Sequence, residues 1–328
     1  MIDRLRVYNG TGFDPHNNLA IEQVLLEGVQ PGEIILYLWQ NQNTVVIGRN
    51  QNAWKECRTT MLAEEGGRLA RRLSGGGAVF HDLGNLNFTF LVRSEDYDLD
   101  RQLSVIMKAV QSFGIEAERS GRNDVLAAGR KFSGNAFYSS RGQSYHHGTL
   151  LVDVDMEKLG RYLNPSKAKL ASKGVDSTRS RVVNLKELAP RMDIEGLRRA
   201  MEAAFAEVYA GQPERIAPEE LDAGKIRTYC EKNRSFDWLY GRKMSFTFAC
   251  EERFPWGGLE LELSVDEGRV QDCVVYTDAM DHSLAEALKQ VLTGSVFSAE
   301  ALCSAVKGCG LEATVCEDIC RMLKEQDI

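Results

Sequence analysis

The stretch RRLSGGGAVFHDLGN, residues 71–85, carries the most unusual local pattern of this chain. Three consecutive glycines at 75–77 stand between two strand-like runs. Glycine in that place costs backbone entropy and offers no packing, which favours a positive φ or a close backbone approach to a ligand. Successive N–H groups can form an anion-binding nest there, and Arg71 and Arg72 add two guanidinium groups. A flexible hairpin is the alternative interpretation.

Outward from this stretch, short apolar runs alternate with turn residues, without regular βαβ order. We therefore predict a mixed sheet rather than a doubly wound parallel one. Asp14 and Asp98 are placed as helix N-caps, with Pro15 at the first helical position. The predicted strands cover residues 34–39, 44–48, 68–72, 78–81, 87–92, 124–127, 131–138 and 146–154. The other predicted helices cover residues 99–113, 194–209 and 219–233.

The 328 residues divide into two parts of different character, although the net charge of −7 is only mildly acidic. Residues 244–328 have 16 acidic and 6 basic side chains and six of the eight cysteines, whereas residues 1–243 have a net charge of +3. We therefore predict two domains, 1–243 and 244–328, the second a small α+β domain. The overall acidity argues against a nucleic-acid partner. The second domain is expected to contain strands at 245–250, 259–265 and 270–276, and helices near 283–292, 298–306 and 312–324.

The cysteines show no CxxC pair. Cys309, Cys316 and Cys320 have the spacing of one helix face, but this spacing fits no zinc motif, so we expect buried thiols. The opening MIDRLRVYNG has no apolar signal core, and no run reaches the ~20 apolar residues of a membrane span. We therefore expect a cytoplasmic protein with reduced thiols and no membrane partner.

Two further stretches contain side chains that suit a binding site. GRNDVLAAGRKFSGNAFY, residues 121–138, places Asp124 before a small-residue strand that begins with Lys131. Asn123 and Asp124 supply hard oxygens for a divalent cation or a ribose, and Lys131 can reach a pocket beside its strand. A solvated lysine at a strand end is the more common alternative. His147 enters an apolar strand, where a packed, hydrogen-bonded histidine is more common than a catalytic one.

The stretch SKGVDSTRSRV, residues 172–182, is basic and rich in hydroxyl groups. Lys173 and Arg179 lie in this loop, whose chemistry suits a nucleotide phosphate. A solvated basic loop is the alternative interpretation.

Taken together and in order, these motifs resemble lipoate–protein ligase A. The resemblance rests on RRLSGGGAVFHDLGNLNFTF, GRND with a downstream RKFSG, HHGTLL and LNPSKAKLASKGVDSTRSRVVNL. FPWGGLELELSVDEG, residues 254–268, is similar to the start of that family's C-terminal accessory domain. The resemblance implies an α+β fold, with a mixed-sheet biotin/lipoate-ligase-like catalytic domain and a small accessory domain.

The family's reaction has two steps. Lipoate and ATP give lipoyl-AMP and pyrophosphate, and the acyl group then passes to a lysine of a lipoyl domain or of the glycine-cleavage H protein. The resemblance implies that Lys131 is catalytic and contacts both substrates, and that Mg²⁺ accompanies ATP, with Asp124 as its ligand. The expected ATP-binding residues are Arg72, Gly77, Ala78, Val79, Phe80, Lys131, Asp124, Lys173 and Arg179. The expected lipoate-binding residues are Lys131, Ser74, Gly75, Gly76, His81 and His147.

Two other functions compete with an ATP-dependent ligase. One is an octanoyl or lipoyl transferase that works without ATP through a cysteine thioester, which requires a thiol in the catalytic core. Only Cys57 and Cys230 lie in the first domain, and neither falls in an expected core strand. The other is a non-catalytic lipoate-binding protein, which could have lost its phosphate-binding groups. The chain departs from the family pattern SGSAYR at Asn135, which replaces Ser, and in lacking the final Arg; we expect these changes to alter the rim of the pocket and not to remove the activity.

Overall fold

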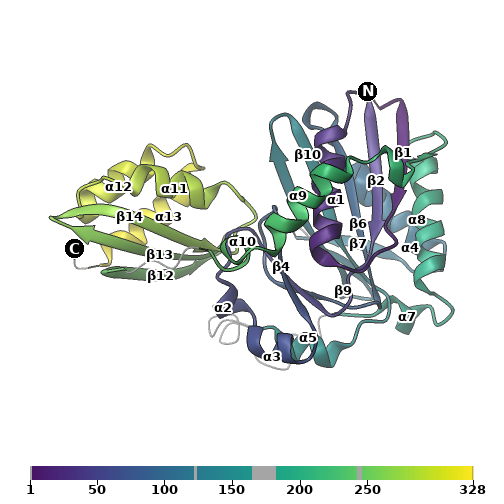
Figure 1. Cartoon of the computed structure of the whole chain (residues 1–328), viewed down its shortest axis with the longest axis horizontal. Coiled ribbons are helices and arrows are strands. Elements are labelled where there is room, and N and C mark those ends of the chain that lie inside the picture. The colour runs from purple at the N-terminus through teal and green to yellow at the C-terminus, as the bar shows by residue number, and fades with distance from the viewer. Residues whose placement is uncertain (1, 122–123, 165–181, 242–245, 327) are drawn as a thin grey trace. The chain divides into compact units, whose positions relative to one another are not determined.

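The computed structural model describes residues 2–121, 124–164, 182–241, 246–326 and 328. The chain divides into two compact units (Figure 1). Unit 1 comprises Met1–Val46, Cys57–Arg71 and Val79–Leu239. Unit 2 comprises Ile47–Glu56, Arg72–Ala78 and Tyr240–Ile328. Two short segments from the first half of the chain thus belong to unit 2, and the predicted boundary at 243/244 lies outside the described residues.

Unit 1 is built on an eight-stranded sheet with the order β11-β1-β2-β6-β10-β9-β8-β7. The sheet is mixed, as predicted, because β1 pairs in parallel with β2 and β11, whereas the pairs from β2 to β7 are antiparallel. The strands are β1 (Arg4–Asn9), β2 (Glu33–Trp39), β6 (Asn85–Arg93), β7 (Ala117–Ser120), β8 (Asp124–Ala127), β9 (Arg130–Ser140), β10 (Gln143–Leu151) and β11 (Glu214–Arg215).

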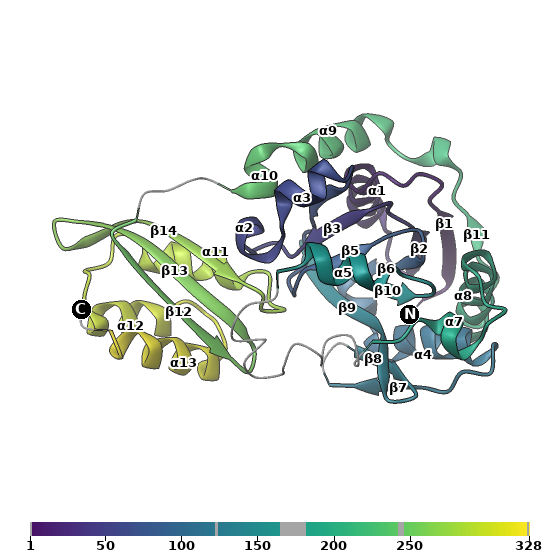
Figure 2. The ribbon, with the colours of Figure 1, turned by 90° about the horizontal axis from the view of Figure 1, so that it is seen from below.

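Helices cover both faces of this sheet (Figure 2). Helices α4 (Leu99–Gln111) and α8 (Ile194–Val208) cover one face, and α1 (Pro15–Gly28) with α9 (Ala223–Arg234) covers the other. The predicted caps are confirmed, since Asp14 accepts from His16 N–H and Asp98 accepts from Arg101 N–H. Short helices complete the unit: α3 (Thr59–Glu64), α5 (Met156–Tyr162), α7 (Leu185–Leu188) and most of α10 (Phe236–Tyr240).

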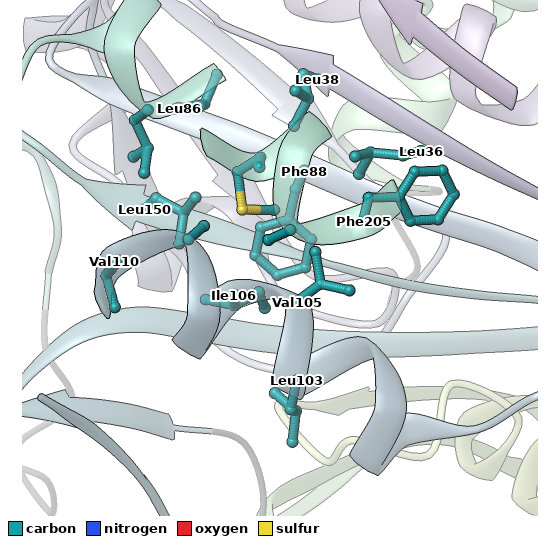
Figure 3. Close-up of a cluster of buried hydrophobic side chains, with 14 of the residues drawn as sticks. Leu36, Leu38, Leu86, Phe88, Leu103, Val105, Ile106, Val110, Leu150 and Phe205 are labelled. Atoms are coloured by element: carbon teal, nitrogen blue, oxygen red, sulfur yellow. The ribbon is translucent and has the colours of Figure 1, made fainter. Parts of the chain in front are cut away.

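The main apolar core lies between the sheet and the α4/α8 pair (Figure 3). Because side chains alternate along a strand, only one face of β2 and β6 enters this core. Leu36 and Leu38 of β2 and Phe88 of β6 are fully buried there against Phe205 of α8. Each such side chain contributes ~1.5–3 kcal/mol by its removal from water.

A second, three-stranded sheet, β4-β3-β5, contains the strands on either side of the glycine-rich stretch. Its strands are β3 (Thr44–Ile47), β4 (Arg68–Arg71) and β5 (Val79–His81), with β3 and β5 antiparallel. The three strands predicted here are confirmed, and each is one residue shorter than predicted.

Unit 2 has a three-stranded antiparallel sheet, β12-β13-β14, whose apolar face packs against three helices. The order of strands followed by helices confirms the predicted small α+β arrangement. The elements are β12 (Phe248–Phe254), β13 (Gly257–Asp266), β14 (Arg269–Thr277), α11 (Leu284–Leu292), α12 (Ala299–Lys307) and α13 (Ala313–Lys324), with α2 (Ala53–Glu56) from the first half of the chain.

The prediction that three cysteines share one helix face is wrong for one of them. Cys316 and Cys320 lie on α13, but Cys309 precedes that helix, because Gly310 has a φ of +80° and interrupts helical geometry. All eight cysteines are free, and all except Cys309 are buried. None of the helices within the described ranges has the length and apolar composition needed to span a lipid bilayer.

Candidate functional site

The face of the large sheet that α1 covers is polar and yet buried. Strand register aligns Ala136, His147, Thr89 and Tyr37 in one row across β9, β10, β6 and β2. The neighbouring row brings Thr149, Asn87 and Trp39 together in the same way. Buried polar side chains are costly unless they are hydrogen-bonded, so the partners of these groups have to be found. Its side chains include Trp39, Asn85, Asn87, Thr89, His147 and Thr149.

A buried carboxylate organises this polar face. Thr89 Oγ1 donates to Glu22 Oε1 over 2.7 Å, and Trp39 Nε1–H donates to Thr89 Oγ1 over 3.1 Å. His147 Nδ1 lies 2.8 Å from the same Glu22 oxygen. Glu22 comes from α1 and is 1% exposed. Glu22 was not predicted from the sequence; the signal that could have found it is an acidic residue within a largely apolar helix.

The neighbouring His146 faces the opposite way, into the α4/α8 core. Its Nε2 lies 2.8 Å from Asn135 Oδ1 and its Nδ1 lies 3.1 Å from Gln102 Oε1. Burial, with smaller contributions from His147 and Arg119, lowers the pKa of His146 to about 3, so the ring is neutral. Asn135, the residue that departs from the family pattern, is therefore a partner of a core histidine.

Lys131 and Asp124 meet at the β8–β9 side of the sheet. Lys131 Nζ lies 2.6 Å from Asp124 Oδ1, and each side chain is about one-third exposed. The Lys131 backbone is held by Val183, whose N–H donates to Lys131 O over 2.9 Å. Val182 and Val183 are the first described residues after 165–181. The predicted nucleotide-loop residues Lys173 and Arg179 lie outside the described residues, as does Asn123.

His81 and Phe80 come from β5, at the end of the glycine-rich stretch. His81 is 3% exposed, with Nδ1 3.1 Å from Asn41 Nδ2, and its ring meets the edge of Trp39. Phe80 is 1% exposed and packs on Tyr162, so its side chain belongs to the core. A contact of Phe80 with nucleotide would therefore have to use its backbone.

The glycine-rich loop belongs to unit 2, where Arg72 shapes it. The Arg72 guanidinium donates to Gly75 O and Gly77 O, both over 2.7 Å, and to Ser74 Oγ over 3.0 Å. Gly76 has a φ of +85° and its N–H donates to Ala279 O over 3.0 Å. The predicted positive φ is present at Gly76, and the backbone that approaches the loop is the chain's own residue 279; the predicted approach to a ligand stays a prediction.

Arg71 has a different role from Arg72. Arg71 Nε donates to Trp238 O over 2.7 Å and its Nη2 donates to Leu239 O over 2.5 Å. These bonds satisfy carbonyls at the end of α10, which have no partner within the helix. Arg72, by contrast, donates to carbonyls of the glycine loop.

The cysteines of unit 1 are poorly suited to nucleophilic chemistry. Cys57 is 2% exposed, and burial raises the pKa of its thiol to about 12. Burial also raises the pKa of Cys230. Because the thiolate is the reactive form, burial disfavours reactivity at both thiols. Within the described ranges, no group of three or more His, Cys, Asp or Glu side chains is arranged to hold a metal ion.

Comparison with known proteins gives the same fold. The P. falciparum LipL1 structure in complex with lipoate is 28% identical, with a TM-score of 0.87 over 98% of this chain and 99% of that one. A lipoate protein ligase from Thermoplasma acidophilum, solved with its E2 lipoyl domain, is 26% identical, with a TM-score of 0.65 over 75% of this chain and 99% of that one.

A lipoate-protein ligase A bound with ATP is 25% identical, with a TM-score of 0.63 over 74% of this chain and 99% of that one. Residues 14–206 match the family described as the lipoyl protein ligase A/B catalytic domain. Residues 243–322 match the bacterial lipoate protein ligase C-terminus. The chain therefore belongs to the lipoyl protein ligase A/B family and has the C-terminal domain of the bacterial lipoate protein ligases.

Proposed function

We propose that this protein is an ATP-dependent lipoate–protein ligase. Lipoate attacks the α-phosphate of ATP, which forms lipoyl-AMP and releases pyrophosphate. The ε-amine of an acceptor lysine then attacks the acyl carbonyl, an amide forms, and AMP leaves. Support comes from the family match and from relatives whose structures contain lipoate or ATP.

Lys131 is the residue that we assign to catalysis in the first step. A carboxylate and a triphosphate repel each other, so the adenylation step needs positive charge at the point where they meet. The Lys131 side chain is one-third exposed and carries a positive charge. Thr149, on the buried polar face, is uncharged. The ammonium can therefore accompany the lipoate carboxylate and the developing charge on phosphorus.

Arg72 and the glycine loop are proposed to bind ATP, together with Ala78, Val79 and the backbone of Phe80. Arg72 holds the carbonyls of Gly75 and Gly77, so it shapes the loop. Lys173 and Arg179 are proposed to add positive charge around the adenylate. The proposed lipoate-binding side chains and backbone groups are those of Ser74, Gly75, Gly76, His81 and His147.

Mg²⁺ is proposed to arrive with the nucleotide, with Asp124 as the protein ligand. A single part-exposed carboxylate fits Mg²⁺, which proteins commonly hold through one or two carboxylates together with substrate phosphates. When bound, the ion would neutralise charge on the departing pyrophosphate.

The observation that favours an ATP-dependent reaction over a thioester mechanism is the burial of the unit 1 thiols. An ATP-independent transferase needs a nucleophilic cysteine. Cys57 is buried and its pKa is raised to about 12, so it does not supply a thiolate at neutral pH. The eight free thiols also fit a reducing compartment, and we propose the cytoplasm.

The acceptor is proposed to be a lipoyl domain, because a relative was solved with its E2 lipoyl domain, and the glycine-cleavage H protein is the second candidate. The test is mass spectrometry of an isolated lipoyl domain after incubation with the protein, lipoate and Mg-ATP. A lipoyl mass gain that requires ATP and persists in Cys57→Ala supports the ligase. A gain without ATP that disappears in Cys57→Ala would establish the transferase instead. Binding of lipoate without any mass gain on either acceptor would indicate a binding protein.

A further inference from the structure

A one-residue irregularity in β9 decides where Lys131 lies. Val125 of β8 pairs with Ser133, but the next residue, Leu126, pairs with Lys131, so Phe132 has no partner in the ladder. This is a β-bulge, which shifts the alternation of side chains between the two sheet faces.

The bulge exchanges the faces of two neighbouring residues. Strict alternation from Gly134 would put Phe132 on the polar face and Lys131 in the core. Instead, Phe132 is fully buried in the α4/α8 core, next to Val125. The Lys131 ammonium lies over Gly134 on the side of Asp124, which is the register partner of Gly134.

Gly134 provides the space for this ammonium. A Cβ at position 134 would lie 2.9 Å from Lys131 Nζ and 3.0 Å from its Cε, closer than real Cβ contacts. The next atom, Thr149 Oγ1, would be at 3.8 Å, an ordinary contact. Gly134 is not among the glycines with positive φ, so its backbone does not require glycine. An added methyl group would instead disturb the position of the Lys131 side chain.

The rest of Lys131 has little freedom to compensate. Its backbone carbonyl accepts from Val183 N–H, and it forms a parallel bridge with Val182. On its other side, Phe132 anchors the strand in the core. A methyl group at position 134 would therefore displace the flexible end of the lysine side chain and leave the strand in place.

We propose that Gly134 is a positioning residue for Lys131: the bulge turns the lysine to the polar face, and the missing Cβ seats its ammonium over β9 beside Asp124. This inference rests on the proposed function of Lys131. Displacement of a catalytic group by ~1 Å can cost ~100-fold in rate, so Gly134→Ala should reduce lipoyl-AMP formation by about 10- to 100-fold.

The experiment compares Gly134→Ala with the unsubstituted parent protein and with Gly160→Ala. Gly160 lies in α5, where a Cβ would meet nothing within 4 Å, so this control adds the same methyl group without displacing a side chain. Lipoate-dependent pyrophosphate–ATP exchange measures adenylation. Reductive methylation with formaldehyde and cyanoborohydride, followed by peptide mass spectrometry, measures the accessibility of Lys131 without substrates. A thermal melt checks that each variant is folded.

The expected result is that Gly134→Ala melts near the parent temperature, loses exchange activity and methylates Lys131 several-fold faster. Gly160→Ala should match the parent in exchange and methylation and melt no lower, because alanine replaces glycine inside a helix. Unchanged methylation of Lys131 in folded Gly134→Ala would overturn the positioning role. Faster methylation with undiminished exchange would show that Gly134 positions the Lys131 ammonium but that this position does not serve adenylation. That result also overturns the proposal.

The variant Lys131→Ala separates this inference from the proposed function. If Lys131→Ala retains exchange while Gly134→Ala still accelerates methylation, Gly134 does position Lys131, and the catalytic assignment of Lys131 is wrong. If Lys131→Ala abolishes exchange, the loss in Gly134→Ala is attributable to the displaced ammonium.

Discussion

Glu22 and His147 lie 125 residues apart in the chain and meet inside unit 1, with 2.8 Å between Glu22 Oε1 and His147 Nδ1. The same carboxylate oxygen also accepts from Thr89, so one buried group joins α1, β6 and β10. The contact places a polar network under the helix that covers the proposed lipoate-binding face.

Removal of this carboxylate should destabilise unit 1. In Glu22→Ala, Thr89 and His147 lose their common partner while buried, and we expect the free energy of unfolding to fall by about 2 kcal/mol. Glu22→Gln retains an acceptor oxygen and should lose less. Urea unfolding followed by tryptophan fluorescence measures both. Equal stability of Glu22→Ala and the parent would show that the network contributes nothing.

The buried His146 predicts a pH dependence of stability. Its pKa is lowered from 6.5 to about 3 in the folded protein, because burial disfavours the charged ring. Between these values the unfolded chain binds a proton that the folded chain does not. Stability from this group is therefore present above pH 6.5 and decreases as the pH falls, by up to about 1.4 kcal/mol per pH unit.

The variant His146→Gln tests this dependence. Urea midpoints measured between pH 7.5 and pH 4.5 should decrease less steeply in the variant than in the parent. His16, whose pKa burial also lowers, titrates in both proteins, so the difference between the two slopes isolates His146. Parallel slopes would contradict the prediction.

Substitutions at Arg71 and Arg72 should affect different properties, stability in the first case and nucleotide binding in the second. Arg71→Ala removes the donors to Trp238 O and Leu239 O and should lower the free energy of unfolding by about 2 kcal/mol, with KM for ATP unchanged. Arg72→Lys keeps the charge but loses the fork that holds Gly75 and Gly77, and should raise KM for ATP about tenfold. Melting curves and initial rates of pyrophosphate exchange check both. The reverse pattern would reassign the nucleotide-binding arginine.

The close approach at the glycine loop predicts that Gly75 tolerates no side chain. A Cβ there would lie 2.3 Å from Ala279 O and 2.6 Å from Met280 O, both of them backbone atoms. Gly75→Ala should therefore destabilise the protein by about 1–3 kcal/mol. Gly308→Ala is the matched control, because its Cβ would meet nothing closer than 3.5 Å. Equal melting temperatures for the two variants would show that the loop adjusts freely.

The sequence predicted most elements to within a few residues, because helix caps, glycine stops and apolar alternation are local signals. Asp98 and the helix that follows it are an example, since the cap, the apolar period and Gly114 all lie within one segment. Strand β1 was missed: its apolar residues are few, and its place is set by parallel pairing with β2. The motif order also indicated the family, which the comparisons confirm.

Non-local pairing decided the rest. By sequence alone Arg71 and Arg72 look alike, and their different roles depend on where α10 ends and where the glycine loop turns. Lys131 was recognised as a candidate, but its direction depends on a bulge at Phe132 that no local pattern marks. The sequence by itself determined which elements form and which residue types can bind anions. Only the tertiary structure decided which face each side chain occupies, because strand alternation has a period of two and a single unpaired residue reverses it.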